Sequence, residues 1–304
     1  MEPIKLLLDT DIDILGDIDD ALCLAYLLAQ PACEVVGITT ATYDTHRRAL
    51  VASALCRAAG KDIPILPGAS TPLLAPLPVF PPQEGPDEEL LLLERWDHAR
   101  TFPQGEAVEF MRRTIREHPG EIILLAVAAY TNVALLFSVD PEIPRLLKGL
   151  VLMGGLFTTR PSGLSPFSLH DWNAQVDPHA TAIVYRAPVA LHRSIGLNIT
   201  QHVTMDAEAF WRAFQPSRLH PMRDFAEAWF RQRPTITFHD PLAATTIFDP
   251  SICRFETGTV EVELASVGVD GLTYWVASRP EPRHEIAVAV DTERFFEHFF
   301  SVLR

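Results

Sequence analysis

The sequence contains few cysteines and few basic residues. None of its four cysteines lies in a C-x-x-C pair, which argues against a zinc finger or a thiol redox motif. Lysine and arginine number 25 against 39 aspartates and glutamates, so the formal net charge is −14 at pH 7. Nucleic-acid binding relies on neutralising phosphates with lysine and arginine. We therefore expect no nucleic-acid partner and favour a protein that handles neutral or cationic small molecules, or metal ions.

Long apolar runs are also lacking. No run reaches the ~18 residues that span a bilayer, and the first residues lack a basic segment followed by an apolar one of secretory length. We therefore expect no membrane partner and, by default, a reduced cytoplasmic location. Hydrophobic residues nevertheless make up 48% of the 304, which is enough for a sizeable core.

Short apolar runs alternate with helical patterns in the first part of the chain. Ile4–Leu8 and Glu34–Thr40 are typical of strands, and Ala21–Gln30 and Thr45–Ala59 are typical of helices. Ile122–Val127 is a continuous apolar run, as expected of a central parallel strand. This alternation predicts an α/β fold with an open, mostly parallel central sheet flanked by helices, similar to the Rossmann fold.

The alternation pauses between Thr71 and Pro103, where proline is dense, and this stretch is predicted to be a long loop or lid. A further strand is predicted at Val189–His192. Later runs at Thr259–Ala265, Thr273–Val276 and Glu285–Val290 predict extra C-terminal strands. Because the α/β pattern returns after the loop, residues 1–304 are predicted to form a single domain.

The segment from Asp9 to Asp20 is the most informative stretch, since it carries six aspartates in twelve residues between a strand and a helix. Carboxylates packed this closely repel one another and raise each other's pKa. A hard divalent cation such as Ca²⁺, which takes roughly six to eight oxygen ligands, relieves that repulsion. The pattern favours a metal site, and the alternative is a solvated acidic turn that caps the helix.

Two other acidic motifs were weighed against this segment. A calcium-binding EF-hand loop needs glycine where Ile14 stands and usually glutamate where Asp20 stands, so we reject it. Phosphatases of the haloacid-dehalogenase type carry D-x-D-x-[TV] after their first strand, whereas Asp11 is followed at that spacing by Asp13. A phosphatase with Asp9 as its nucleophile stays as an alternative.

Two further motifs are weak when taken alone. Phe238-His239-Asp240-Pro241 places a carboxylate beside a histidine at the start of an apolar helix. Asp171-Trp172-Asn173 places a carboxylate and a carboxamide where they could bind the vicinal hydroxyls of a sugar.

In their order and spacing, these pieces resemble the inosine-uridine-preferring nucleoside hydrolase family, and the resemblance runs from residue 4 to the C-terminus. The family's first motif is matched by Asp9-Thr10-Asp11 and Asp19-Asp20. The other matching segments are Ile38-Thr39-Thr40 with Asp44, Val127 to Asn132, Leu152 to Gly155, Asp171-Trp172-Asn173 with Asp177-Pro178, and His239-Asp240-Pro241.

The resemblance implies Ca²⁺-dependent hydrolysis of the N-glycosidic bond of ribonucleosides to free base and ribose, with a metal-activated water attacking the anomeric carbon. It implies that the metal ligands are Asp11, Asp20, Asp240 and the backbone carbonyl of Val127. Asp9 would not bind the metal itself but would help to hold the ligands in position.

Catalytic and substrate-binding roles also follow from the resemblance. Asp11 would take the proton of the attacking water, and His239 would protonate the leaving base. The residues implied to hold the ribose are Asp19, Asp44, Met153, Asp171 and Asn173. Members of the family form dimers or tetramers, so a homo-oligomer is expected.

The chain departs from the family pattern in several places, two of which concern these residues. Its acidic loop is longer, and the extra residues include Asp13 and Asp17, either of which could displace Asp11 as a ligand. Asp171 stands where the family has glutamate, which is one methylene longer. These departures leave open a relative that binds nucleoside or ribose without hydrolysing it, and the base preference cannot be read from the sequence.

Overall fold

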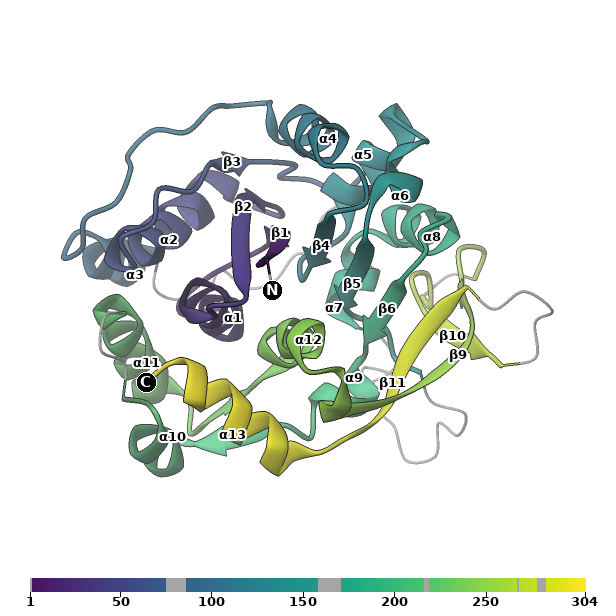
Figure 1. Ribbon diagram of the computed structural model, residues 1–304. Helices are drawn as coiled ribbons and strands as arrows, with labels where there is room; N and C mark the ends of the chain where they lie inside the picture. Colours follow the sequence, from purple (N-terminus) through teal and green to yellow (C-terminus); the bar gives the residue numbers. More distant parts are fainter. Residues whose placement is uncertain (1, 75–85, 158–170, 216–218, 267, 278–282) are drawn as a thin grey trace.

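The computed structural model describes residues 2–74, 86–157, 171–215, 219–266, 268–277 and 283–304. Within them, nine strands form one sheet in the order β10-β9-β11-β6-β5-β4-β1-β2-β3 (Figure 1). Neighbouring strands from β3 to β11 are parallel, whereas β9 is antiparallel to both β11 and β10. The predicted open, mostly parallel sheet with extra C-terminal strands is therefore confirmed. The strands are β1 Ile4–Thr10, β2 Cys33–Thr40, β3 Ile65–Pro67, β4 Ile122–Ala126, β5 Gly149–Met153, β6 His192–Ile195, β9 Cys253–Val262, β10 Thr273–Val276 and β11 His284–Val290.

Helices cover both faces of this sheet (Figure 1). They are α1 Asp19–Ala29, α2 Thr45–Ala58, α3 Pro86–Leu93, α4 Ala107–Glu117, α5 Thr131–Val139, α6 Ile143–Leu146, α7 Trp172–Val176, α8 Pro178–Arg186, α9 Leu197–Thr200, α10 Ala207–Ala213, α11 His220–Gln232, α12 His239–Phe248 and α13 Thr292–Val302. A short 3-10 helix, η2 Pro250–Ile252, follows α12, and β7 Thr204–Asp206 pairs with β8 Thr235–Thr237 in a separate antiparallel ribbon.

The apolar run of β1 is explained by burial on both of its faces. Leu6 and Leu8 point into a core shared with α1, α2, α11, α12 and α13. Leu7 points into a second core shared with α4, α5, α6 and α8. Because successive side chains of a strand point to opposite faces, a strand covered by helices on both sides must be apolar throughout.

Two predictions about secondary structure were wrong. The stretch from Thr71 to Pro103 is not all loop, since it contains helix α3, whose Leu92 and Leu93 are buried in the core. Residues 75–85 of that stretch lie outside the described part. The strand predicted at Val189–His192 begins only at its last residue, because β6 spans His192–Ile195.

The order of the strands creates a switch point at β1. This strand pairs with β2 on one side and with β4 on the other, so Asp9 lies in register with both Thr39 and Ala126. Ligands of open parallel sheets bind at such a point, beyond the carboxyl ends of the strands. The acidic loop follows β1 at this edge, and Val127 follows β4 there.

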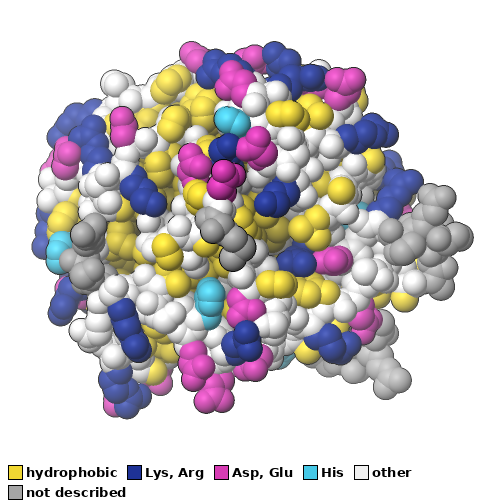
Figure 2. Space-filling view, in the orientation of Figure 1, with side chains coloured by type: hydrophobic (Ala, Val, Ile, Leu, Met, Phe, Trp, Pro, Cys, Tyr) yellow, Lys and Arg dark blue, Asp and Glu magenta, His cyan; other side chains and the backbone are white. Residues whose placement is uncertain are grey.

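Two surface properties bear on possible partners. No helix among the described residues combines the length and the apolar character that crossing a membrane requires. The face drawn in Figure 2 carries basic and acidic side chains interspersed with hydrophobic ones, and neither charge forms a continuous patch on its coloured part.

Candidate active site

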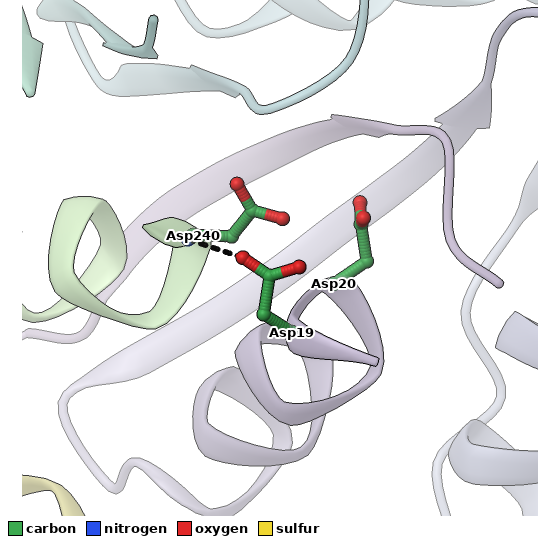
Figure 3. A group of neighbouring side chains, drawn as sticks. All are labelled: Asp19, Asp20 and Asp240. Atoms are coloured by element: carbon green, nitrogen blue, oxygen red, sulfur yellow. Dashed lines mark hydrogen bonds between the residues drawn. The ribbon is translucent and has the colours of Figure 1, made fainter. Parts of the chain in front are cut away.

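Three aspartates meet where the first turns of two helices adjoin. Asp19 and Asp20 begin α1, and Asp240 is the second residue of α12. One carboxylate oxygen from each lies within 4.8 Å of the others, and the Asp240 amide donates to Asp19 Oδ2 over 3.0 Å. Figure 3 shows the three carboxyl groups gathered at this junction. The amino-terminal ends of both helices favour the negative charge.

The three carboxyl groups destabilise one another when ionised. Burial raises the pKa of Asp19, Asp20 and Asp240 well above the usual range, and repulsion from neighbouring aspartates raises it further. The Thr10 hydroxyl donates to Asp20 Oδ1 and partly offsets the rise for Asp20. A buried set of oxygen donors at this spacing fits a hard divalent cation, which would relieve both the burial cost and the repulsion.

Asp11 lies beside this trio and faces a buried arginine. Its charge contributes to the raised pKa of Asp20 and Asp240, which shows that the groups are close. Asp11 Oδ2 is 4.0 Å from Arg48 Nη2. Burial raises the pKa of Asp11, and Arg48 works in the opposite direction. The trio defined by distance thus contains Asp19, expected at the ribose, and does not contain Asp11, expected as a ligand.

Asp9 is held behind the loop by two polar side chains. Its Oδ1 accepts from Thr39 Oγ1 at 2.6 Å and from Asn132 Nδ2 at 2.8 Å. Its Oδ2 is buried and has no hydrogen-bond partner among the described residues. Burial raises the pKa of Asp9 to about 7, although both hydrogen bonds oppose the rise. Asp9, near the carboxyl end of β1, is thus held by side chains from β2 and α5.

Asn173 joins the ends of β4 and β5. Its Nδ2 donates to the Val127 carbonyl at 2.8 Å and to the Met153 carbonyl at 3.1 Å. The structure therefore brings Val127, Met153 and Asn173 together, as the sequence predicted. The Val127 carbonyl, expected to face a metal, is the acceptor of this amide.

Asp171 caps helix α7 and braces the turn after β5. Its Oδ2 accepts from the Gly155 and Ala174 amides, both at 2.9 Å, and its Oδ1 accepts from the Asn173 amide at 3.3 Å. Burial raises the pKa of Asp171 despite these bonds. The shorter side chain at this position therefore binds backbone amides, which fixes the Gly154-Gly155 turn against α7.

His239 and Asp44 lie at the starts of two different helices, α12 and α2. His239 Nδ1 lies 2.7 Å from Thr200 Oγ1. Burial lowers the pKa of His239, and the nearby charge of Asp17 partly opposes this. Asp44 is exposed and caps α2 by accepting from the Arg47 amide at 2.9 Å.

The extra residues of the acidic loop are fixed in place. Ile12, Ile14 and Ile18 are fully buried in the core that contains α1. Asp13 Oδ1 accepts from the loop amides of Leu15 and Gly16 at 3.0 and 2.9 Å.

The second oxygen of Asp13 lies 3.3 Å from Arg47 Nη2. Burial opposes ionisation of Asp13, but Arg48, the Gly16 amide and Arg47 together hold its pKa below its usual value. Asp13 therefore stabilises the loop, whereas Asp17 is exposed at its end.

Sequence reasoning missed several residues that build this site. Arg48 and Thr200 carried no motif, and Tyr130 was given no role within the Val127 to Asn132 segment, although each contacts a predicted site residue or its neighbour. One signal was present for Arg48, since two consecutive arginines three and four residues after Asp44, in a chain this acidic, suggest that a carboxylate lies nearby.

Comparison with known proteins decides the family. A model of the family described as "Inosine-uridine preferring nucleoside hydrolase" matches residues 6–297. The chain belongs to this family. Membership makes it an N-glycosyl hydrolase, and a match over nearly the whole chain decides against the phosphatase alternative.

Relatives at moderate identity carry matching names. Uridine nucleosidase 1 of Arabidopsis thaliana is 26% identical, with 97% of this chain and 91% of the relative covered. The pyrimidine-specific ribonucleoside hydrolase RihA of Salmonella paratyphi A is 28% identical, with 92% and 93% covered. The purine-preferring ribonucleoside hydrolase of Gardnerella vaginalis has a solved structure that aligns with a TM-score of 0.79 at 23% identity, over 98% of each chain. That likeness shows the shared fold.

Proposed function

We propose that this chain hydrolyses the N-glycosidic bond of ribonucleosides in a Ca²⁺-dependent reaction that yields free base and ribose. The observation that carries the proposal is the meeting of α1 and α12, which gathers Asp19, Asp20 and Asp240 within 4.8 Å at the switch point of the sheet. Membership of the nucleoside hydrolase family supports the reaction class.

Asp20, Asp240 and Asp11 would hold the cation. The Val127 carbonyl would join them once the Asn173 amide, which now donates to it, moves to a sugar hydroxyl. When bound, Ca²⁺ supplies a Lewis acid that makes water a better nucleophile near neutral pH. Asp11, on the loop beside the aspartate trio, would take the proton of the attacking water as a general base. Asp9 holds the end of β1 from behind through Thr39 and Asn132.

The ribose is proposed to bind between the aspartate trio and the end of β5. Asp19, Asp44 and Asn173 would accept from or donate to its hydroxyls, with Met153 and Asp171 forming the wall beside them. Cleavage of a glycosidic bond passes through an oxocarbenium-like state. Buried carboxylates around the sugar stabilise the positive charge that develops there.

His239 is proposed to assist the leaving base. With Nδ1 against Thr200, its Nε2 is left to face the substrate. Proton donation by a positioned group is typically worth about 10²–10⁴-fold in rate. Burial lowers the pKa of His239, and the charge of Asp17 opposes this shift, which favours the protonated imidazole that a proton donor requires.

The proposal extends to the domain, the assembly and the location of the chain. We treat residues 1–304 as one catalytic domain, expect a homo-oligomer by analogy with the family, and expect a cytoplasmic location. All four cysteines are buried free thiols, which suits a reducing compartment.

The test is a panel of purine and pyrimidine ribonucleosides, with uridine first because two relatives are named for uridine or pyrimidine substrates. Free ribose and free base are measured with added Ca²⁺ and with chelator, and with or without phosphate. We expect ribose release that needs metal and is indifferent to phosphate. Ca²⁺ binding without ribose release from any nucleoside would instead support a protein that binds nucleosides and does not hydrolyse them.

A further inference from the structure

Arg48 lies between the acidic loop and the turn that leads to Asp44. It is in the first turn of α2 and is only 8% exposed. Its Nε donates to the Thr42 carbonyl at 2.8 Å, and its Nη1 donates to the Ile12 carbonyl at 3.2 Å. Its Nη2 faces Asp11 Oδ2 at 4.0 Å. One planar guanidinium therefore contacts two separate segments of the site.

The two carbonyls belong to residues that lie next to, or close before, the two proposed functional aspartates. Ile12 directly follows Asp11, the proposed base. Thr42 and Tyr43 have φ values of 68° and 57°, and they set the direction of the chain into Asp44. Residues other than glycine rarely adopt this left-handed conformation, because it strains the backbone. Such a turn persists only where surrounding contacts fix it, and the Arg48–Thr42 bond is one of them.

The charge of Arg48 matters as well as its geometry. Its neighbours from the acidic loop are Asp11 and Asp13, and Asp20 of α1 is also within its electrostatic reach. A positive charge among these groups reduces their mutual repulsion at short range, where little water screens it. Arginine suits this position because its rigid fork bonds two acceptors at once, whereas a lysine ammonium is a single point charge.

We propose that Arg48 is a positioning residue that fixes Asp11 and Asp44 relative to each other across the site. The proposal rests on the function proposed above, in which Asp11 acts on water and Asp44 on the ribose. Arg47 plays a different part, because it pairs with Asp13 and lies 3.6 Å from Glu89 of α3, so it ties down the outer side of the loop.

The test compares Arg48→Met and Arg48→Lys with Arg193→Met as a matched control. Arg193 is also a largely buried arginine that donates to a carbonyl and a carboxylate, Thr246 and Glu285, but on β6. Misplacing reacting groups by about 1 Å can cost roughly 100-fold. We expect Arg48→Met to lower kcat/KM by about that factor, with a fall in kcat from Asp11 and a rise in KM from Asp44.

Arg48→Lys should recover only part of the loss, because its ammonium cannot bond both carbonyls. Guanidinium ion at millimolar concentration should partly restore an Arg48→Ala variant, and urea should not. Arg193→Met is expected to lose stability and to keep kcat and KM near wild type. Wild-type kcat and KM in both Arg48→Met and Arg48→Lys would overturn the proposal.

A readout that does not depend on activity separates this proposal from the proposed function. Hydrogen exchange at the amides of residues 11–16 and 41–44 should speed up together in the Arg48 variants and stay unchanged in Arg193→Met. If the wild type hydrolyses no nucleoside, the proposed function fails, and exchange still decides whether Arg48 couples the two segments. Exchange that changes in only one segment, or in neither, would overturn the coupling.

Discussion

Asn132 Nδ2 donates to Asp9 Oδ1 over 2.8 Å, and the same amide nitrogen lies 3.1 Å from the Thr40 carbonyl. The Asn132 Oδ1 atom also accepts from the Ala69 amide at 2.8 Å. This one side chain, in the first turn of α5, thus ties together the carboxyl ends of β1 and β2 and the segment after β3.

Replacing Asn132 with alanine should therefore affect both stability and metal binding. Each buried partner left without a hydrogen bond costs about 1–3 kcal/mol. Loss of a hydrogen-bonding residue in the shell outside the metal ligands typically weakens metal binding by about 10–100-fold. Chemical denaturation and calorimetric Ca²⁺ titration measure the two effects. A variant that loses stability but binds Ca²⁺ as tightly as wild type would show that the Asn132–Asp9 bond has no role in the metal site.

Glu89 should make the stability of the chain depend on pH. Burial raises its pKa from 4.5 to about 8, and the charge of Asp13 raises it further, against the effect of Arg47. The folded state therefore favours the protonated form. The resulting stabilisation is complete below pH 4.5 and is lost as the pH rises through about 8.

The Glu89→Gln variant stays neutral at every pH and isolates this effect. It should match wild type near pH 5 and exceed its free energy of unfolding above pH 8, by up to about 4 kcal/mol, since one pKa unit corresponds to about 1.4 kcal/mol. The control is Glu88→Gln, on the same helix but exposed, which should show no such divergence. Parallel stability curves for wild type and Glu89→Gln from pH 5 to 9 would be inconsistent with a buried neutral Glu89.

Any side chain at Gly154 should lower the stability of the chain. Its φ is +151°, and a Cβ there would overlap the hydroxyl of Tyr130, which itself donates to the Met153 carbonyl at 2.8 Å. Overpacking of this kind costs about 1–3 kcal/mol, and the strained backbone adds to it.

A double-mutant cycle tests that explanation for Gly154. Gly154→Ala should destabilise the chain by about 3 kcal/mol, and Tyr130→Phe by about 1 kcal/mol through its lost hydrogen bond. Because Tyr130→Phe removes the atom that the new methyl group would overlap, the double variant should be less destabilised than the sum of the two. If chemical denaturation shows that the two losses of free energy of unfolding simply add, then Gly154→Ala destabilises the chain through backbone strain and not through overlap with Tyr130.

The role of His239 can be separated from substrate binding by the choice of leaving group. His239→Gln should lower kcat for natural nucleosides by about 10²–10⁴-fold, because the base then leaves without a proton donor. The same variant should cleave p-nitrophenyl riboside nearly as fast as wild type, since that leaving group needs no proton. Equal losses on both substrates would assign His239 to positioning rather than to acid catalysis.

Much of the fold could be predicted from the sequence because local patterns and tertiary structure agree. Strand β1 is apolar because it is buried on both faces. The segment after it is acidic because it lies at the open edge of the sheet, where ligands bind. Strand β6 was misplaced because its polar side chains are paired in the fold. His192 Nε2 lies 3.1 Å from the Val184 carbonyl, and Ser194 lies 3.0 Å from the Tyr185 hydroxyl. Hydrophobicity alone does not reveal such pairs.

The site was predicted less completely than the fold. Motifs predicted that Asp20 and Asp240 would lie close together, as they do, but whether Asp11 or Asp19 lies nearest to them depends on the path of the longer loop. That path is set by Asp13, which binds its own loop amides and Arg47, a contact between positions 34 residues apart. The two arginines of α2 likewise act through the tertiary contacts of the helix, which no local motif encodes.

The most direct test of the central claim is a Ca²⁺ titration of chelator-treated protein in which bound metal and ribose release are measured on the same samples. In the wild type, ribose release from the best nucleoside should rise in proportion to bound Ca²⁺, from near zero without metal. In Asp20→Ala, both binding and release should be lost at Ca²⁺ concentrations that saturate the wild type. Full activity in metal-free wild type, or unchanged Ca²⁺ binding by Asp20→Ala, would contradict the account.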